Sequence, residues 1–343
     1  MTATPPGLAA QLRAAPVAVQ QIPVVDFTAF HASGATQRKQ TAVALAKALR
    51  DSGFAYLTGH QVPQALTDQA FAQARRFFAL PDTVKAEIAV DRSPCHRGWF
   101  AVGAENLDPA TQPHGDRKEG IKIGNDLPPE HPLVQAGVPY HGPNQWPPGQ
   151  PQFRSTMEAY WRAMRRLAQQ VLHATAVALE LAEDHFDPWF TEPMATLGPL
   201  HYPPQPGPIR EDQLGAGAHT DFGCITLLAQ DDTGGLQVRN RAGQWVSAPP
   251  VRGAFVVNIG DMLARWTNDL LTSTPHRVIN TSGGDRYSIP FFYDPDHDTP
   301  LACIPTCLAP GEQPNHPPTT ALGHLRERFS ATFDYLAPSP REV

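Results

Sequence analysis

The hydrophobic pattern of the chain changes near residue 195. Before that point, apolar residues recur at the spacing of amphipathic helices. This spacing predicts helices over residues 36–51, 63–79 and 151–181. Shorter apolar runs predict strands at residues 22–27 and 54–57. Residues 92–150 are rich in glycine, proline and polar residues, so we expect loops with short strands there.

After residue 195, apolar residues fall in short runs that are rich in strand-forming residues and separated by glycine, aspartate and proline. The predicted strands cover residues 197–202, 224–229, 236–239, 254–259, 278–280 and 287–293. Residues 316–337 show helical spacing again. Many short strands at this spacing are typical of a β-sandwich or barrel. We therefore predict a mainly β fold, an antiparallel core wrapped by helices drawn mainly from the N-terminal half.

The pattern indicates one domain rather than two. We expect a catalytic domain over residues 21–343, after a poorly ordered tail at residues 1–20. Within the domain, residues 21–195 form a helical and loop region. Residues 196–300 form the β-core, and residues 301–343 form a C-terminal segment.

Composition narrows the function. The chain has 343 residues, 41% of them hydrophobic and 17% charged, and a net charge of -6, which gives no reason to expect a nucleic-acid or membrane partner. No apolar run approaches the roughly 20 residues that span a bilayer. The four cysteines lack the density of a disulfide framework, and we see no secretory signal. We expect a cytoplasmic protein, monomeric or a weak homo-oligomer.

Candidate metal ligands occur in the predicted β-core. Ferrous iron for O2 chemistry needs three ligands on one side, and two histidines with one carboxylate meet that need. A His-x-Asp triplet can supply two, because residues i and i+2 share one strand face. The chain has three such triplets, His114-Gly115-Asp116, His185-Phe186-Asp187 and His219-Thr220-Asp221. The first is in a polar loop and the second closes the long helix. The third lies between a Gly-rich loop and an apolar strand, which favours it.

The third ligand should be a histidine on a distant core strand, and His276 fits. Further along the chain, Arg286 and Ser288 again have i, i+2 spacing, so both could point inward from one strand. A buried arginine is costly unless it meets an anion, and a guanidinium beside a hydroxyl suits a carboxylate. The ordinary alternative is an exposed Arg286 paired with Asp285 or Asp294.

At these residues the chain resembles the iron(II)/2-oxoglutarate-dependent oxygenases, specifically the isopenicillin N synthase-like branch. The order of His219-x-Asp221, His276 and Arg286-x-Ser288 matches that family. Several accessory stretches also resemble it, and the likeness extends over about residues 20–300. They include Arg97-Gly98-Trp99-Phe100, Lys118-Glu119-Gly120, His201-Tyr202-Pro203-Pro204 and Asn258-Ile259-Gly260-Asp261.

The resemblance implies a double-stranded β-helix, or jelly-roll core, with Fe(II) near one end. It implies that Arg286 and Ser288 bind the distal carboxylate of 2-oxoglutarate, and that Tyr202 helps to hold this co-substrate. The implied activity is oxidation of a small organic molecule with O2, with release of succinate and CO2. Hydroxylation is the default outcome, and desaturation or ring closure also occur in the branch. The substrate itself is not indicated.

The substrate pocket should be built from the N-terminal loops and the C-terminal segment, with Phe100, Lys122 and Phe292 as candidates. Lys122 interrupts the apolar run Ile121-Lys122-Ile123. If it faces the iron, it could pair with an anionic substrate. A solvated lysine on an edge strand is the more ordinary interpretation.

Three alternatives stay open. One is an iron-dependent oxidase of the same fold that does not use 2-oxoglutarate, and another is a non-enzymatic jelly-roll binding or sensor protein. The third is a structural zinc site with Cys224 as fourth ligand, although on a regular strand Cys224 would point away from Asp221. We expect structural roles for His201, Asp261 and the pair Cys303 and Cys307.

Overall fold

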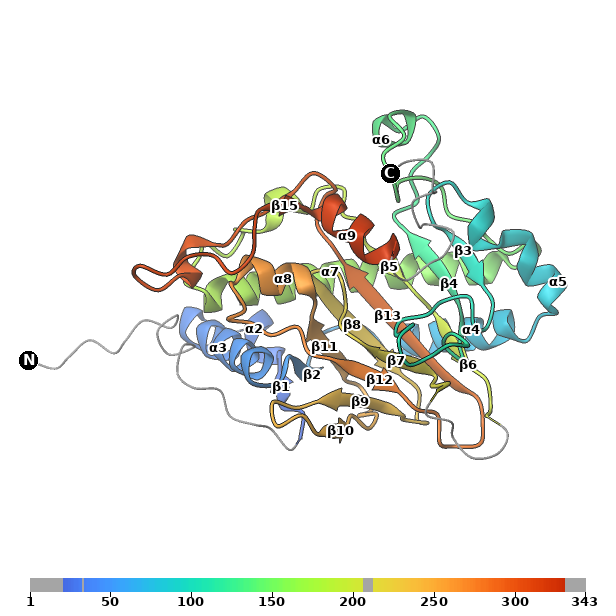
Figure 1. Ribbon diagram of the computed structural model, residues 1–343, viewed down its shortest axis with the longest axis horizontal. Coiled ribbons are helices and arrows are strands. Elements are labelled where there is room, and N and C mark those ends of the chain that lie inside the picture. Colours follow the sequence, from blue (N-terminus) through green and yellow to red (C-terminus); the bar gives the residue numbers. More distant parts are fainter. Residues whose placement is uncertain (1–20, 33, 206–211, 331–343) are drawn as a thin grey trace, which may run out of the picture.

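The computed structural model describes residues 21–32, 34–205 and 212–330 of the chain (Figure 1). The predicted tail at residues 1–20 and the end of the predicted helix 316–337 lie outside these residues. Two sheets and a set of surrounding helices make up the described fold. This arrangement agrees with the predicted jelly-roll core.

The larger sheet has nine strands and includes both halves of the chain. Its path runs β1 (Val24–Asp26), β2 (Phe54–Thr58), β11 (Phe255–Ile259), β8 (Ile225–Gln230), β13 (Arg286–Tyr293), β5 (Thr196–Leu197), β4 (Glu119–Gly124) and β3 (Gly98–Phe100). The ninth strand, β6 (Leu200–Tyr202), pairs with both β13 and β4. The N-terminal region therefore supplies four strands to the core as well as the helices that cover it.

The smaller sheet has four strands, in the order β10 (Trp245–Ser247), β9 (Leu236–Arg239), β12 (His276–Val278) and β7 (Ala216–His219). A separate pair joins β14 (Pro300–Leu301) to β15 (Thr319–Thr320). In Figure 1 the four-stranded sheet lies toward the viewer, while the long helix α7 passes behind the strands.

The described helices confirm the three long predicted ones. The α-helices are α2 (Thr28–Ala32), α3 (Ala35–Ser52), α4 (Gln64–Phe78), α5 (Asp82–Lys85), α6 (Pro132–Gln135), α7 (Pro151–Ala178), α8 (Asp261–Trp266) and α9 (Ala321–Ser330). The 3-10 helices are η1 (Ala86–Ile88), η2 (Val90–Arg92), η3 (Asp187–Trp189) and η4 (Pro305–Cys307). Helix α8 was not predicted, because six residues are too few to establish helical spacing.

Alternation along the strands produces two separate apolar clusters. In β2, Ala55 and Leu57 face the large cluster that also contains the buried side of α7. Their neighbours Phe54 and Tyr56 face a smaller cluster with residues such as Val238 from the four-stranded sheet. Successive side chains of a strand point to opposite faces, so one sheet can pack against helices and against the second sheet. The candidate ligands lie between the two sheets.

Three details differ from the sequence prediction. The predicted strand 197–202 is two strands, since Pro199 between them has no N–H for the ladder. The Gly-rich residues 215–217, predicted to be a loop, belong mostly to β7, because the facing strand β12 supplies backbone partners. The predicted strand 278–280 begins earlier, so β12 includes His276 itself.

Gly53 ends α3 in the left-handed conformation, with φ 73°. A Cβ atom there would lie 2.2 Å from Oγ1 of Thr274 and 2.5 Å from the carbonyl oxygen of Thr272. Only glycine therefore lets the end of α3 approach the segment that leads into β12.

We expect Gly53→Ala to lower the free energy of unfolding by more than the roughly 1–2 kcal/mol that a left-handed backbone costs an alanine. Urea denaturation would measure the loss. Gly137→Ala is the matched control, since Gly137 also has a positive φ of 65° but a Cβ there would meet nothing within 4 Å among the described atoms. Equal losses in the two variants would contradict the proposed clash.

Candidate metal centre

Two of the candidate ligands face each other across one strand pair. In the antiparallel pairing of β7 with β12, His219 lies directly opposite His276. Their ring centroids are 4.2 Å apart. On its other edge β12 pairs with β9, which places His276 opposite Val238. The register of these strands therefore brings the two imidazoles together.

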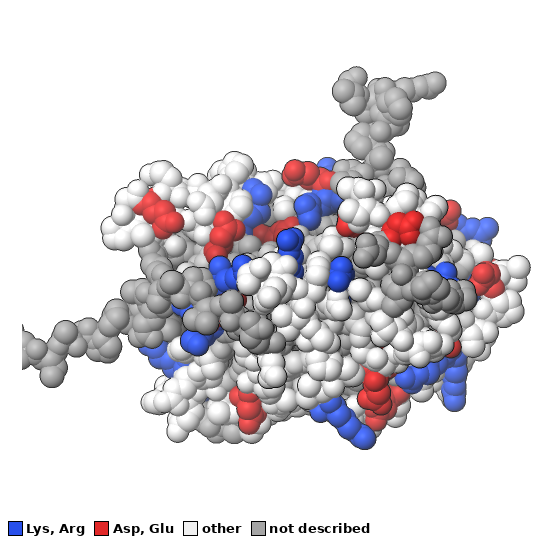
Figure 2. All heavy atoms as spheres, turned by 60° about the horizontal axis from the view of Figure 1, so that its bottom comes forward, with Lys and Arg blue, Asp and Glu red and all other residues white. Residues whose placement is uncertain are grey.

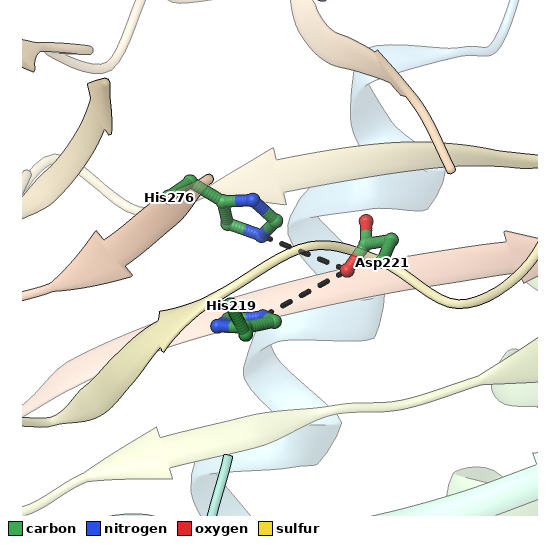
Figure 3. Close-up of side chains that lie close together, drawn as sticks. All are labelled: His219, Asp221 and His276. Atoms are coloured by element: carbon green, nitrogen blue, oxygen red, sulfur yellow. Dashed lines mark ion pairs between the residues drawn. The ribbon is translucent and has the colours of Figure 1, made fainter. Parts of the chain in front are cut away.

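Asp221 completes the group from the segment that follows β7 (Figure 3). Its Oδ1 is 3.8 Å from Nε2 of His219 and 3.6 Å from Nε2 of His276. One potential ligand atom from each residue lies within 4.8 Å of the others. Within the described ranges, this is the one group of three or more His, Cys, Asp or Glu with such spacing. The group does not include Cys224, so it lacks the cysteine that the zinc alternative needed.

The surroundings orient each ligand atom toward the common centre. Nδ1 of His219 is 2.8 Å from the carbonyl oxygen of Gly217, and Nδ1 of His276 is 3.2 Å from that of Thr274. Each carbonyl accepts a hydrogen bond from a protonated Nδ1, which leaves the Nε2 lone pair for a metal.

The carboxylate is oriented in the same way. Oδ2 of Asp221 accepts hydrogen bonds from Oγ1 of Thr226 at 2.5 Å and from Nδ2 of Asn258 at 2.6 Å. Oδ1 remains directed at the histidines. Asn258 belongs to the motif quoted for the family resemblance, but its contact with Asp221 was not predicted, because β11 is far from Asp221 in sequence.

The electrostatics of the site favour the metal-binding protonation states. Burial lowers the pKa of His219 to about 3, and His276 acts in the same direction. Burial alone would raise the pKa of Asp221, but His276, His219 and the two hydrogen bonds outweigh it and lower that pKa. A neutral imidazole and a charged carboxylate are the forms that coordinate a divalent cation. The donor set of two nitrogens and one oxygen fits iron(II) with positions left for other ligands.

Arg286 is buried, at 1% exposure, which contradicts the exposed alternative. Its guanidinium donates to Oγ of Ser288 at 3.4 Å, to Oε1 of Gln230 at 3.2 Å and to the carbonyl oxygen of Gly234. It also lies 4.5 Å from the ring centroid of Tyr202, its cross-strand partner. No ion pair among the described residues involves Arg286, so this buried cation has no carboxylate partner within them.

A single cavity joins these two groups of residues. It is lined by the three candidate ligands, by Arg286, Ser288 and Tyr202, and by the pocket candidates Phe100, Lys122 and Phe292. The interpretation of Lys122 as a solvated edge-strand residue is wrong. Strand β4 lies inside the sheet between β3 and β5, and the Lys122 side chain is only 14% exposed.

Several functional candidates were missed by sequence reasoning. Asp116, set aside as part of a triplet in a polar loop, is fully buried and accepts a hydrogen bond from the backbone N–H of Gly217 at 2.9 Å. Lys118 pairs with Asp116 and, at 2.7 Å, with Glu105, and both Lys118 and Glu105 line the cavity. Two signals were available for them: the close spacing of opposite charges in a Gly- and Pro-rich segment, and the position of Lys118 in a stretch that resembles the family.

Residues outside the candidate site lie in the following surroundings. His201 lies between Glu119 at 2.8 Å and Asp285 at 2.7 Å. Cys303 and Cys307 do not form a disulfide with each other. In the second triplet, Asp187 pairs with His173 at 2.8 Å on the surface of the helical layer.

Comparison with known families matches two parts of the chain. Residues 22–149 match the family described as "non-haem dioxygenase in morphine synthesis N-terminal". Residues 195–295 match the 2OG-Fe(II) oxygenase superfamily. The second match contains all the candidate metal and co-substrate residues.

Individual relatives are similar over nearly their whole length. A 2-oxoglutarate-Fe(II) type oxidoreductase of Emericella nidulans is 40% identical over 326 residues, which cover 94% of this chain and 93% of that protein. A 2-oxoglutarate-dependent dioxygenase of Monascus ruber is 38% identical, covering 84% of this chain and 88% of that one. The crystal structure of a Neurospora crassa protein in complex with alpha-KG and thymine has a TM-score of 0.78 at 32% identity, covering 90% of this chain and 96% of that one.

A divalent cation held by Asp221 should depend on the hydrogen bond from Asn258. We expect Asn258→Ala to weaken Fe(II) binding by about 10- to 100-fold, because the carboxylate loses its orientation, and Asp221→Ala to abolish tight binding. Anaerobic calorimetric titration with Fe(II) would measure both. Asn315→Ala, an exposed asparagine, should bind Fe(II) like the unchanged protein. Tight binding by Asp221→Ala would show that the ligand assignment is wrong.

Proposed function

The chain belongs to the 2OG-Fe(II) oxygenase superfamily, and we propose that it hydroxylates a small organic molecule at an iron held by His219, Asp221 and His276. The protein is an Fe(II)- and 2-oxoglutarate-dependent oxygenase that uses O2. Succinate and CO2 are the expected products of the co-substrate. When bound, iron supplies activation of O2 coupled to oxidation of the 2-oxo acid.

The side chains of this protein have three tasks around that chemistry. The two histidines and Asp221 hold the metal from one side, and Thr226 and Asn258 fix the carboxylate. Apolar side chains from both sheets, such as Leu228 and Leu236, line the cavity and reduce its contact with water. The protein supplies binding and orientation, while the cofactor carries the chemistry.

Arg286 is the observation that carries the proposal. A buried guanidinium without a carboxylate partner among the described residues lies in the same cavity as the three candidate ligands. Its planar fork suits a bidentate carboxylate, and the hydroxyl of Ser288 adds a further donor beside it. The distal carboxylate of 2-oxoglutarate fits this position, with the ring of Tyr202 stacked on the guanidinium.

The two alternative functions fit less well. A jelly-roll sensor needs neither a complete metal-ligand set nor a buried arginine in the same cavity. An oxidase that does not use 2-oxoglutarate disagrees with the activity for which relatives of 38–40% identity are named.

The protein surface supports a monomer or weak homo-oligomer. Among the described residues the exposed large hydrophobic side chains are Val24, Val102 and Val251, which are far apart in sequence and suggest no extended apolar interface. On the face shown in Figure 2, basic and acidic side chains are interspersed. Light scattering that detects a stable dimer would contradict this proposal.

Two observations bear on location. No helix of the described residues is long and apolar enough to cross a bilayer. None of the four cysteines, all of which lie in the described residues, forms a disulfide, which supports the cytoplasmic location we propose. A disulfide in the protein isolated from its source under non-reducing conditions would contradict a reducing compartment.

Succinate release tests the function directly. Incubation with Fe(II), 2-oxoglutarate and O2 and a series of small candidate substrates should give succinate in step with substrate loss. Substrate loss without succinate would show that the protein is an iron-dependent oxidase that does not use 2-oxoglutarate.

We expect Arg286→Leu to weaken 2-oxoglutarate binding by at least tenfold, because a charge-assisted hydrogen bond contributes about 1.5–3 kcal/mol. An anaerobic titration of the Fe(II)-loaded protein would follow the charge-transfer band of the bound 2-oxo acid. Arg286→Lys should recover part of the affinity, since it keeps the charge but not the fork. The control Arg76→Leu removes an exposed arginine of α4 and should change nothing. Unchanged binding by Arg286→Leu would place the carboxylate elsewhere.

A further inference from the structure

A group of charged side chains lies in the cavity on residues from the N-terminal half. Arg97, Glu105, Lys118 and Lys122 line the cavity, and Asp116 lies behind Lys118. We call these five residues the charged cluster. All are at least partly buried, although charged side chains are rarely buried without a partner.

Four members of the cluster balance one another. Glu105 is 2.7 Å from Nζ of Lys118 and 3.3 Å from Nζ of Lys122. Lys118 also pairs with Asp116. Two lysines therefore face two carboxylates, and Lys118 makes the closer contact with Glu105. The ion pair of Lys122 with Glu105 is the longer of the two.

Arg97 adds a positive charge that this group does not neutralise. Arg97 is 3% exposed, and within the described residues its guanidinium donates to backbone carbonyls, such as those of Cys95 at 3.1 Å and Tyr140 at 2.7 Å. Its Nε has no hydrogen-bond partner within the described structure. Asp126 attracts it from a distance but forms its ion pair with Arg154, at 3.4 Å. The charged cluster thus has one excess positive charge.

The pKa values of two neighbouring groups bear on this excess charge. Burial lowers the pKa of Lys122, and the positive charges of Lys118 and Arg97 lower it further. The carboxylate of Glu105 opposes this shift by raising the pKa. Asp294 also lines the cavity, but its carboxyl accepts the backbone N–H of Cys224 at 2.8 Å, and burial raises its pKa to about 7. It is therefore a weak counter-charge for the cluster near neutral pH.

Aromatic rings form the walls beside the cluster. The ammonium of Lys122 lies 5.3 Å from the centroid of the Phe100 ring. Phe329 of α9 packs against Tyr140 at 5.2 Å and against Phe222 at 5.9 Å between ring centroids. All four rings line the cavity, which gives an aromatic wall next to a cationic group, with Phe329 packed edge-to-face against Tyr140 and Phe222. Such a surface suits a small aromatic or other planar body.

We propose that the substrate is a small organic acid with a planar apolar body, and that Lys122 binds its carboxylate. The charged cluster holds one more positive than negative charge through Arg97, a buried excess is costly, and an entering anion would offset it. Arg97 and Lys118 strengthen the positive potential around Lys122. The proposal rests on the proposed function, because the acid would occupy the same cavity as iron and 2-oxoglutarate.

The test compares acids with their neutral amides. The protein is loaded with Fe(II) and 2-oxoglutarate without O2, and calorimetry measures binding of benzoate, phenylacetate, benzamide and phenylacetamide. We expect the acids to bind at least tenfold more tightly than the amides, as a charge-assisted hydrogen bond predicts. Lys122→Met should remove this preference, and Lys122→Arg should keep part of it. Lys39→Met, at an exposed position of α3, is the matched control.

The possible results separate the two proposals. Failure of every acid to bind, equal binding of acids and amides, or an unchanged preference in Lys122→Met would overturn the assignment of an acid to Lys122. Normal 2-oxoglutarate binding in those same samples would leave the proposed function standing, and it also shows that Lys122→Met is folded. Absence of 2-oxoglutarate binding in the unchanged protein would overturn the proposed function together with this inference.

Discussion

The antiparallel pairing of β7 with β12 is the constraint on which the site depends. It places His219 opposite His276, with their ring centroids 4.2 Å apart, and leaves Asp221 on the turn that follows. A shift of one residue in this register would turn one imidazole to the other face of the sheet. Two glycines, Gly53 and Gly217, support the strands that form this pairing. Gly53 lets α3 approach the segment before β12, and Gly217 bonds to the buried Asp116.

Burial then determines what each charged group in the cavity can do. The proposed iron ligands, Arg286 and the charged cluster share one space between the sheets and the N-terminal strands, where a charge needs a partner. Asp221 has its partners in two histidines and two hydrogen-bond donors. Arg286 and Arg97 have no carboxylate partner in ion-pair contact among the described residues. Both positions are therefore suited to anions from outside the chain, a co-substrate at one and a substrate near the other.

Elements and side-chain directions were predicted correctly from the sequence where short-range spacing alone determines them. Helical spacing was enough for α3, α4 and α7, and i, i+2 spacing was enough to put Arg286 and Ser288 on one face of β13. The prediction failed at residues 215–217, where three small residues have no strand propensity and only the backbone of β12 makes a strand. It also undervalued Asp116 and Lys122, because neither the polar loop nor the interrupted apolar run reveals which side chains other elements will cover.

The sequence by itself therefore determined the chemical types and their order: two histidines and an aspartate suited to a metal, then an arginine and a serine suited to a carboxylate. These follow from residue identity and short spacings along strands. Only the tertiary structure decided which histidine lies beside His219, whether Arg286 and Lys122 are buried, and that Glu105 and Lys118 line the same cavity. Those properties depend on contacts between segments far apart in the chain, and burial rather than residue type decides whether a charge must find a partner.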